Sequence, residues 1–201
     1  MRRIVRLPFA IAVACVLFLA CGGSTSVGTN PSDGGGSQST MCGPSSEPLA
    51  SWFLAGSDPS QYQMGFDTTM TCNGGPALSL ASSTATGQQQ FGTAMTEKMP
   101  GSFAGHRLRL SGWVLAQDVT GWAGLWMRVD TASQMGVAFD NMQCRPISGT
   151  GGWSQYQVVL DVESDAADVA YGILLTDQGK VWLDGVTVEV VDSSVPTTGC
   201  P

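Results

Sequence analysis

The sequence predicts an all-β protein, a two-sheet β-sandwich that follows a cleaved signal and a flexible linker. Three observations support this prediction. Apolar and polar residues alternate along several segments after residue 50, no helical stripe of apolar residues follows the N-terminal leader, and clusters of Gly, Pro, Ser and Asn separate the alternating segments. Alternation is the pattern of half-buried strands, and many short strands divided by turns are typical of a sandwich.

Ten segments are expected to form strands. In the segment 107–114, for example, Leu108, Leu110 and Val114 share one face, and charged or bulky residues occupy the other. The Gly-Trp-Ala-Gly sequence at 121–124 and the Gly-rich sequence at 148–152 are expected to form turns. The expected strands cover residues 51–55, 61–67, 77–82, 91–98, 107–114, 125–130, 135–140, 155–162, 168–176 and 179–191.

The last expected strand changes phase in its middle. Val181 and Leu183 point to one face, but Val186 and the valines after it continue one residue out of phase. One extra residue in a strand shifts the alternation in this way and defines a β-bulge. We therefore expect a bulge at residues 184–185.

The first twenty-one residues have the pattern of an export signal. Three arginines within the first six residues precede a short apolar run, which ends in Leu-Ala before Cys21. A basic start, a short apolar core and a small residue before the cut mark a secretory signal, and the run is too short for a membrane span of about 20 residues. The pattern resembles a bacterial lipoprotein signal, which implies that residues 1–20 are removed and that Cys21 is acylated. The alternative is an ordinary signal peptide with an incidental cysteine.

The segment 21–41 is rich in Gly, Ser and Thr, and we expect it to be a flexible tether for a globular domain at 42–201. Gly22 follows the cysteine at a position where aspartate favours retention in the inner membrane of well-studied enterobacteria. The resemblance therefore implies a protein of the cell envelope, lipid-anchored in the outer membrane, either periplasmic or exposed at the surface.

The charge of the chain disfavours nucleic acid as a partner. Removing residues 1–20 takes away three of the nine basic residues and none of the sixteen acidic ones, which leaves a formal charge of −10. Such a surface repels nucleic acid and anionic lipid. Attachment to a membrane is therefore expected to depend on the lipid anchor.

Four cysteines remain in the expected mature domain, and an even number in an exported protein predicts two disulfides. Three pairings are open. We favour Cys42–Cys200, because both residues lie at the domain ends and the ends of sandwich domains often meet, and this choice leaves Cys72–Cys144. With no C-x-x-C sequence and the single histidine His106, a Cys/His zinc site is not expected.

Several short sequences suggest a family for the globular part. They are WFLAGSDP at 52–59, GWAGLWMRVD at 121–130, AFDNM at 138–142 and GKVWLD at 179–184. On these residues the segment 52–191 resembles a bacterial jelly-roll domain of the galactose-binding-like group, a fold shared with carbohydrate-binding modules of glycoside hydrolases. Related segments occur in bacterial proteins of varied architecture, some beside DNA-binding domains. The resemblance implies the fold, but a fold does not determine an activity.

Three tryptophans are the main candidates for contact with a ligand. Trp113, Trp126 and Trp182 occupy the polar phase of their strands, as do Arg128 and Asp140. Flat aromatic rings beside hydrogen-bonding side chains suit a sugar, whose CH-rich face stacks while its hydroxyl groups form hydrogen bonds. If these strands are neighbours, the rings form the floor of a glycan groove. The alternative is a secondary core in which a loop covers the rings.

Three further candidates come from loops. Trp122 is either an exposed platform at the edge of the sandwich or a plug at one end of its core. Asp140 and Asn141 lie near the end of a strand and are candidates for ligand binding. The alternative for Asp140 is a polar loop network in which it pairs with Arg145.

Asp184 is the candidate metal ligand. It resembles the last-strand aspartate that helps to hold a structural calcium ion in many jelly-roll binding modules, and calcium prefers such oxygen ligands. Those modules often carry a second carboxylate at the next position, where this chain has Gly185. The alternative is an aspartate that stabilises its own bulge. No other cofactor is expected.

No motif supports catalysis. The sequence contains no G-x-S-x-G, no H-E-x-x-H and no phosphate-binding glycine loop, and His106 is expected at the surface. We therefore expect a non-catalytic, membrane-tethered module that binds a glycan. The alternative is a structural or protein-interaction lipoprotein of the envelope without a sugar ligand and with an unknown protein partner. Open, coplanar tryptophan rings would favour the first hypothesis, and buried rings the second.

Overall fold

The computed structural model describes residues 42–83, 90–98 and 101–200, which all belong to one compact unit, Gln38–Pro201. The expected signal, tether and acylated Cys21 lie outside the described residues. Within the described residues, no helix has the length and hydropathy needed to cross a membrane. The strands are β1 (Phe53–Gly56), β2 (Tyr62–Asp67), β3 (Ala77–Ser82), β4 (Phe91–Lys98), β5 (Arg107–Thr131), β6 (Ala138–Asp140), β7 (Ile147–Asp161), β8 (Ala166–Thr176) and β9 (Lys180–Val191). Short 3-10 turns cover Leu49–Ser51, Pro59–Gln61 and Gly101–Phe103.

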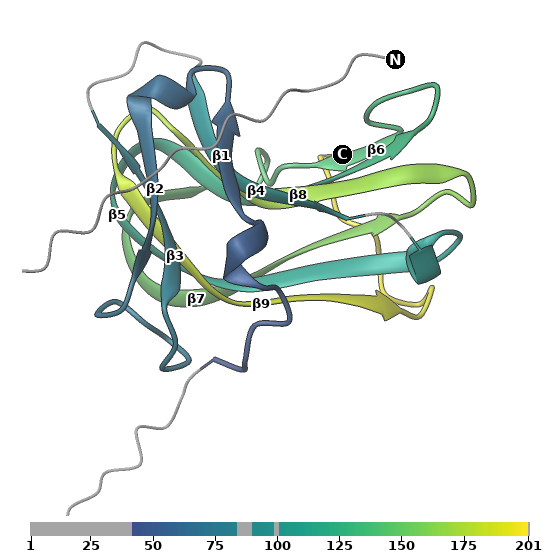
Figure 1. Cartoon of the computed structure of the whole chain (residues 1–201), viewed down its shortest axis with the longest axis horizontal. Helices are drawn as coiled ribbons and strands as arrows, with labels where there is room; N and C mark the ends of the chain where they lie inside the picture. The colour runs from purple at the N-terminus through teal and green to yellow at the C-terminus, as the bar shows by residue number, and fades with distance from the viewer. Residues whose placement is uncertain (1–41, 84–89, 99–100, 201) are drawn as a thin grey trace, which may run out of the picture. The chain divides into compact units, whose positions relative to one another are not determined.

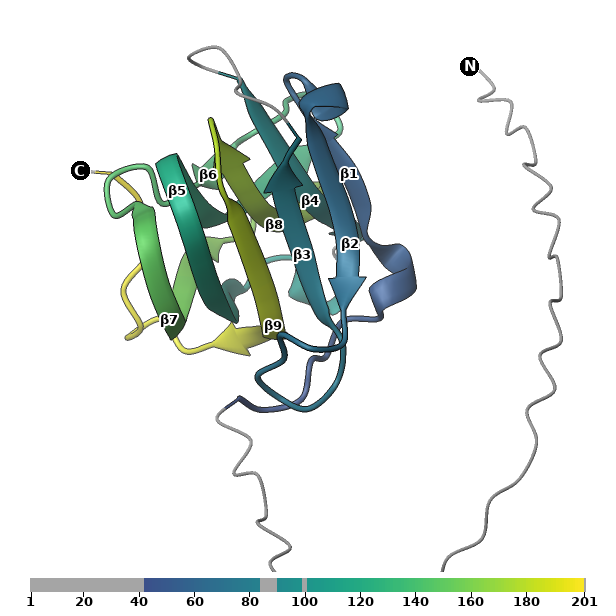
Figure 2. The same ribbon diagram turned by 90° about the vertical axis from the view of Figure 1, so that its left-hand side faces the viewer.

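The strands form two antiparallel layers that share the long strand β5 (Figure 1). The first sheet contains β1, β4, β8, the second half of β5, and β6. The second sheet contains β7, the first half of β5, β9, β3 and β2, and Figure 2 shows this sheet in front of β8, β4 and β1. The predicted β-sandwich is confirmed.

One continuous strand covers two of the predicted strands and the turn expected between them. β5 includes residues 121–124, so Trp122 lies in a strand and the turn prediction is wrong. The register of β5 with β7 shifts three times between Val114 and Ala123, and Asp118 has a positive φ of 52°. Bulges and bends of this kind let a strand pass from one sheet to the other. Residues 148–152 are likewise part of β7 instead of a turn.

Alternation along the strands builds the core between the sheets. In the first half of β5, Leu108, Leu110 and Val114 are buried in the main hydrophobic cluster with Leu80 of β3 and Ile173 of β8. The predicted bulge in β9 is confirmed, because the register with β5 shifts between Ser111 and Trp113. These alternating positions decide which side chains face the core and which face outward.

The predicted disulfide pairing is wrong. The structure pairs Cys42 with Cys72 and Cys144 with Cys200, with Cα–Cα distances of 5.4 and 5.5 Å. The two ends of the domain do not meet. Residues 42–46 run beside the bulge of β9, where a Cβ on Gly185 would lie 3.3 Å from Cys42, whereas Thr198, near Cys200, is hydrogen-bonded to Val159 of β7.

Candidate functional site

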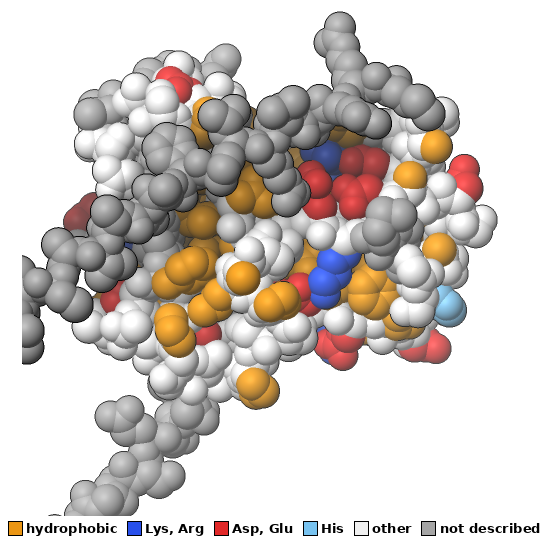
Figure 3. Space-filling model, in the orientation of Figure 1, with side chains coloured by type: hydrophobic (Ala, Val, Ile, Leu, Met, Phe, Trp, Pro, Cys, Tyr) orange, Lys and Arg blue, Asp and Glu red, His pale blue; other side chains and the backbone are white. Residues whose placement is uncertain are grey.

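A groove of about 410 Å³ opens on the outer face of the first sheet, within the size range of small-molecule sites. Trp122, Trp126, Phe91 and Phe139 contribute aromatic rings to its lining, and Arg128 contributes a charged group. Figure 3 shows hydrophobic side chains gathered on the face seen in Figure 1, with acidic and basic side chains beside them. We call the groove lined by these aromatic residues the aromatic groove, and we call the first sheet the groove sheet.

The register of the groove sheet shows which residues surround Trp126. Met95, Gly172 and Trp126 are register partners in one row across β4, β8 and β5. In the next row Leu174 pairs with Gly124, which is two residues before Trp126 on the same face of β5. Neither glycine lines the groove, because a Cβ on Gly172 would lie 2.3 Å from the Ala94 carbonyl and a Cβ on Gly124 would lie 2.7 Å from the Asn141 carbonyl. The two glycines therefore let neighbouring backbone pack closely against the sheet, and larger side chains form the walls of the groove.

Trp126 forms the floor of the groove. Its side chain is only 6% exposed, and its indole N–H donates a 2.7 Å hydrogen bond to the hydroxyl of Thr93. That hydroxyl donates to the carbonyl of Ile173 at 2.9 Å. Both bonds fix the ring before any ligand arrives, and a fixed ring loses little conformational entropy on binding.

Trp122 forms one wall. It is half-buried, and its backbone is held on both sides by Thr176, whose hydroxyl accepts from the Trp122 N–H at 2.8 Å and donates to the Trp122 carbonyl at 3.0 Å. Gly121 makes this contact possible, since a Cβ there would lie 2.4 Å from the same hydroxyl. The ring is therefore anchored by its backbone and open to the groove.

Arg128 and Asp130 form the charged end of the groove sheet. The guanidinium of Arg128 donates through Nε and Nη2 to the Asp130 carboxylate at 2.8 to 3.0 Å, and the Gly136 N–H adds a third donor at 2.7 Å. Burial raises the pKa of Asp130, but these donors outweigh burial and leave the pKa below its ordinary value. Asp168 of β8 is the register partner of Asp130. Burial and the nearby Glu97 raise the pKa of Asp168 above its ordinary value.

A second wall comes from β6 and the residue after it, Phe139 and Asn141. The sequence pattern placed Phe139 on the core-facing phase, but its side chain is 51% exposed and Asp140 is 4% exposed. The polarity of β6 is therefore the reverse of the expected one, and Phe139 is a groove residue that the sequence analysis missed. The sequence signal for this reversal was Arg145, five residues after Asp140. A nearby arginine can act as the counter-ion of a buried carboxylate, so it indicated that Asp140 could face inward and Phe139 outward.

Asp140 lies behind the groove wall. Its carboxylate accepts hydrogen bonds from the Met142 N–H at 2.9 Å, from both Nη atoms of Arg145, and from the Thr198 hydroxyl. The polar network proposed as the alternative, with Arg145 paired to Asp140, is confirmed. Burial raises the pKa of Asp140, but Arg145, Thr198 and the Met142 N–H together hold it below its ordinary value.

Two of the predicted site residues lie on the second sheet. Trp182 is 3% exposed; its indole N–H donates to Asp67 at 2.9 Å, and the ammonium of Lys180 lies 4.3 Å from its ring centroid. Trp113 is half-buried and is the register partner of Asp184. The structure thus brings Trp122, Trp126, Arg128 and Asn141 together but not Trp113 or Trp182. The expected groove floor made of the rings of Trp113, Trp126 and Trp182 is therefore wrong, because these rings lie on two different sheets. Trp126 and Trp182 are buried, and by the criterion of open or buried rings their burial favours the alternative without a sugar ligand.

Asp184 is buried and bonded to backbone N–H groups. One carboxylate oxygen accepts from Cys72 at 2.8 Å and Asn73 at 3.0 Å, and the other accepts from Gly185 at 2.7 Å. This arrangement matches the alternative in which the aspartate stabilises its own bulge. Across the described residues, no group of three or more His, Cys, Asp or Glu side chains has the arrangement to hold a metal ion. The calcium role of Asp184 stays a prediction.

Comparison with known sequences finds one relevant relative. No protein-family model matches the chain. The chain is 40% identical over 150 residues to the uncharacterized HTH-type transcriptional regulator YbfP of Bacillus subtilis (strain 168), a match that covers 75% of this chain. The chain spans only about half of that regulator, because the match covers 51% of it.

Comparison with solved structures identifies the fold. The N-terminal CBM22-1–GH10 modules of Clostridium thermocellum endo-1,4-β-D-xylanase 10B, solved with xylohexaose, align with a TM-score of 0.54 and 14% identity over 74% of this chain and 28% of that one. A xylan-binding domain of CBM22 aligns with a TM-score of 0.51 and 14% identity over 72% of this chain and 90% of that domain. The chain therefore has the β-sandwich fold of carbohydrate-binding modules.

Proposed function

We propose that this protein is a non-catalytic glycan-binding module that Cys21 tethers to the cell envelope. The observation that supports glycan binding most strongly is the aromatic groove itself. It combines the rings of Trp122, Trp126 and Phe139 with the polar groups of Arg128 and Asn141 in one hollow face. This combination suits a ligand with CH-rich faces and hydroxyl edges.

The spacing along β5 gives the groove a direction. Trp122 and Trp126 are four residues apart on the same face, about 13 Å at roughly 3.3 Å per residue, with Gly124 between them. We expect a sugar chain lying along β5 to stack on both rings and to pass beside Asn141, whose carbonyl packs over Gly124. Hydrogen-bond donors flank this path, because within the described residues Arg128 Nη1 and Asn141 Nδ2 have no hydrogen-bond partner.

The structural neighbours suggest which ligands to test first. One matched domain is described as xylan-binding, and the matched xylanase modules were solved with xylohexaose. Identities of 14% support the fold alone, so xylan oligosaccharides are probes and not an assignment.

A glycan array followed by calorimetric titration tests the proposal. The compact unit Gln38–Pro201 is compared with its Trp122→Ala variant and with Trp113→Ala as a control, because Trp113 is half-buried on the other sheet. Loss of one stacking ring is expected to weaken binding at least about tenfold. Trp113→Ala should bind like the parent.

Two outcomes of this experiment contradict glycan binding. If no glycan on the array binds the parent unit, the envelope lipoprotein without a sugar ligand replaces the proposal. If Trp113→Ala and Trp122→Ala weaken binding equally while both remain folded, the groove is not the site.

The lipid anchor requires a separate test. The pattern that ends at Cys21 implies acyl chains, and two or more chains suffice for stable membrane attachment. We expect Cys21→Ser to release the protein from membranes or to block its processing in the bacterium. Equal sedimentation of both forms with membranes, at the same mature mass, would contradict the anchor. Fractionation of the same cells tests the proposed outer-membrane location.

The similarity to a transcriptional regulator does not change this proposal. The matched 150 residues cover about half of that protein, and this chain has a formal charge of −7, which disfavours DNA as a partner. The same kind of ligand-binding sandwich could be joined to other domains in the regulator and to a lipid anchor in this protein.

A further inference from the structure

The wall of the aromatic groove that contains Phe139 and Asn141 is built on a very short strand. β6 has three residues, and its register partners on β5 run only from Met127 to Val129. Yet this strand and the residue after it supply Phe139 and Asn141 to the groove. Because three register pairs give little stability to an edge strand, other contacts must fix the two side chains.

Asp140 provides the largest set of such contacts. It lies in sequence between the two groove residues, and its carboxylate accepts hydrogen bonds from Met142, Arg145 and Thr198. These partners come from the loop after β6 and from the C-terminal segment. A charged acceptor that joins two segments behind the wall restricts the movement of the residues on both sides of it.

The backbone of the wall is also strained and tightly packed. Met142 is buried with a positive φ of 64°, a conformation that side chains other than glycine rarely adopt. A Cβ at Gly124 would lie 2.7 Å from the Asn141 carbonyl. Such strain persists only where surrounding contacts hold it, and the Met142 N–H is one of the donors to Asp140.

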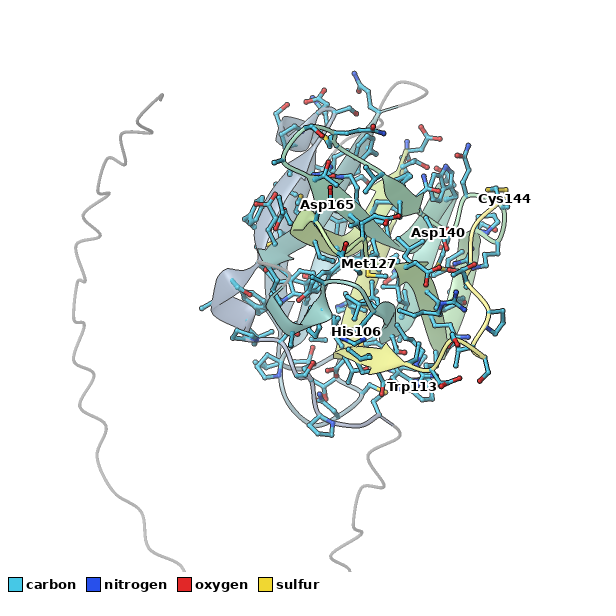
Figure 4. The ribbon with its side chains drawn as sticks, turned by 90° about the vertical axis from the view of Figure 1, so that its right-hand side faces the viewer. His106, Trp113, Met127, Asp140, Cys144 and Asp165 are labelled. Atoms are coloured by element: carbon cyan, nitrogen blue, oxygen red, sulfur yellow. A yellow bond between two sulfur atoms is a disulfide. The ribbon has the colours of Figure 1, made fainter. Side chains whose placement is uncertain are left out.

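Two residues near the C-terminus, Thr198 and Cys200, also hold the segment that carries the wall. The Thr198 N–H donates to the Val159 carbonyl at 2.8 Å, and the Val159 N–H donates to the Thr198 hydroxyl at 2.8 Å. Two residues later Cys200 forms the disulfide with Cys144, which belongs to the loop after β6. Figure 4 shows Asp140 and Cys144 on the same side of the domain, with the disulfide beside them.

We propose that Asp140 and the Cys144–Cys200 disulfide are positioning elements that hold Phe139 and Asn141 in the glycan-binding geometry, so that glycan affinity depends on the oxidation of this disulfide. The inference rests on the proposed function. It changes the role of Asp140 from the predicted ligand contact to a group that acts through its neighbours. It also separates the two disulfides, since Cys42–Cys72 lies at the bulge of the second sheet.

A matched pair of disulfide variants tests the role of oxidation. In the unit Gln38–Pro201, the double variants Cys144→Ser/Cys200→Ser and Cys42→Ser/Cys72→Ser are both expected to lower the melting temperature. Only the first is expected to weaken binding of the best glycan from the array, about tenfold. Equal effects of the two variants on affinity would overturn the proposal, as would unchanged affinity in the first.

A double-mutant cycle tests Asp140. If Asp140 acts through Phe139 and Asn141, Asp140→Asn weakens binding in the parent but has little further effect in a Phe139→Ala/Asn141→Ala background. Thr198→Val should reproduce part of the effect. Additive losses would overturn the positioning role, because they would mean that Asp140 affects binding independently of both groove residues.

A measurement without ligand separates this inference from the proposed function. The backbone N–H groups of Met142 and Gln143, which donate to Asp140 and Asn141, should exchange faster with solvent in Asp140→Asn and in Cys144→Ser/Cys200→Ser. If the parent binds no glycan, the proposed function fails, and with it the dependence of affinity on oxidation. Unchanged exchange in both variants would overturn the positioning of the wall, whatever the parent binds.

Discussion

The outer faces of the two sheets each contain a buried tryptophan, but only one of these tryptophans lines a groove. Trp126 on the groove sheet and Trp182 on the second sheet are 6% and 3% exposed. Each indole N–H has a side-chain acceptor, Thr93 at 2.7 Å and Asp67 at 2.9 Å. By residue type, strand phase and burial the two positions are equivalent.

The neighbours of each ring make the difference. Beside Trp126, the side chains of Phe91, Trp122 and Phe139 line the groove, and Trp126 itself is part of the lining. Around Trp182, Lys180 lies over the ring and Asp67 holds its edge. Small neighbours alone do not explain this difference, because the register row of Trp182 contains Ser79 and Gly65. An aromatic residue on the outer face of a sheet lines a binding surface only where no neighbouring side chain covers its ring, and otherwise it becomes a satellite core.

The largest expected effect is the loss of stability in Trp182→Ala. Truncation of a buried tryptophan costs about 3–5 kcal/mol of unfolding free energy, and here it also leaves Asp67 without its indole donor. Denaturant unfolding of the unit Gln38–Pro201 measures the change. The glycan affinity of the folded variant should equal that of the parent. A loss of binding without a loss of stability would contradict the claim that Trp182 is a core residue and not part of the binding surface.

A smaller effect is expected from acidification of the second sheet. Hydrogen bonds from the Trp182 indole, from Thr69 and from the Met70 N–H hold the pKa of Asp67 well below its ordinary value. A lowered pKa contributes stability that is present above the ordinary value of about 3.9 and is lost as the pH falls through the folded-state value.

Asp67→Asn tests this pH dependence. The variant should be less stable than the parent at neutral pH, and its unfolding free energy should fall less steeply below about pH 4. Denaturant unfolding at several pH values gives both slopes. The residual slope reports the other aspartates with lowered pKa, Asp130, Asp140, Asp161 and Asp192. Parallel slopes would contradict the role of Asp67.

The smallest effect is expected at the acidic end of the groove sheet. Burial and Glu97 raise the pKa of Asp168, so the folded state disfavours its ionised form, and this cost is present at neutral pH. Asp168→Asn should therefore raise the melting temperature slightly at pH 7. The gain should vanish below about pH 3.9, where the carboxyl group is protonated in both states. A lower melting temperature at neutral pH would contradict this account.

The sequence predicted the strands better than their partners. Strands β3 and β4 have the predicted bounds, and the bulge at Asp184 and Gly185 followed from a phase change in the valines. Period two shows which residues share a face of one strand, but it does not show which sheet that strand joins. The three tryptophans on the polar phase were therefore expected together, although Trp126 lies on one sheet and the other two on the second.

Long-range contacts explain the other differences. The disulfide pairing depends on which strands lie next to the segments that carry Cys42 and Cys200, and local sequence patterns do not encode these contacts. The burial of Asp140 depends on Thr198, which is 58 residues away in the sequence. The sequence places Asp140 on the polar phase of its strand, which implies a core-facing Phe139, but an exposed aromatic residue and a buried carboxylate reverse the usual pattern there. Such a reversal is expected where a residue serves a site.

The comparison of Phe139→Ala with Phe66→Ala tests most directly whether the aromatic groove binds glycan. Both phenylalanines are about half exposed, at 51% and 45%, but Phe139 lines the groove and Phe66 lies on β2 of the second sheet. Calorimetric titration of both variants with the best glycan from the array should show an affinity reduced about tenfold for Phe139→Ala and unchanged for Phe66→Ala. Equal affinity in the two variants and the parent would contradict the account.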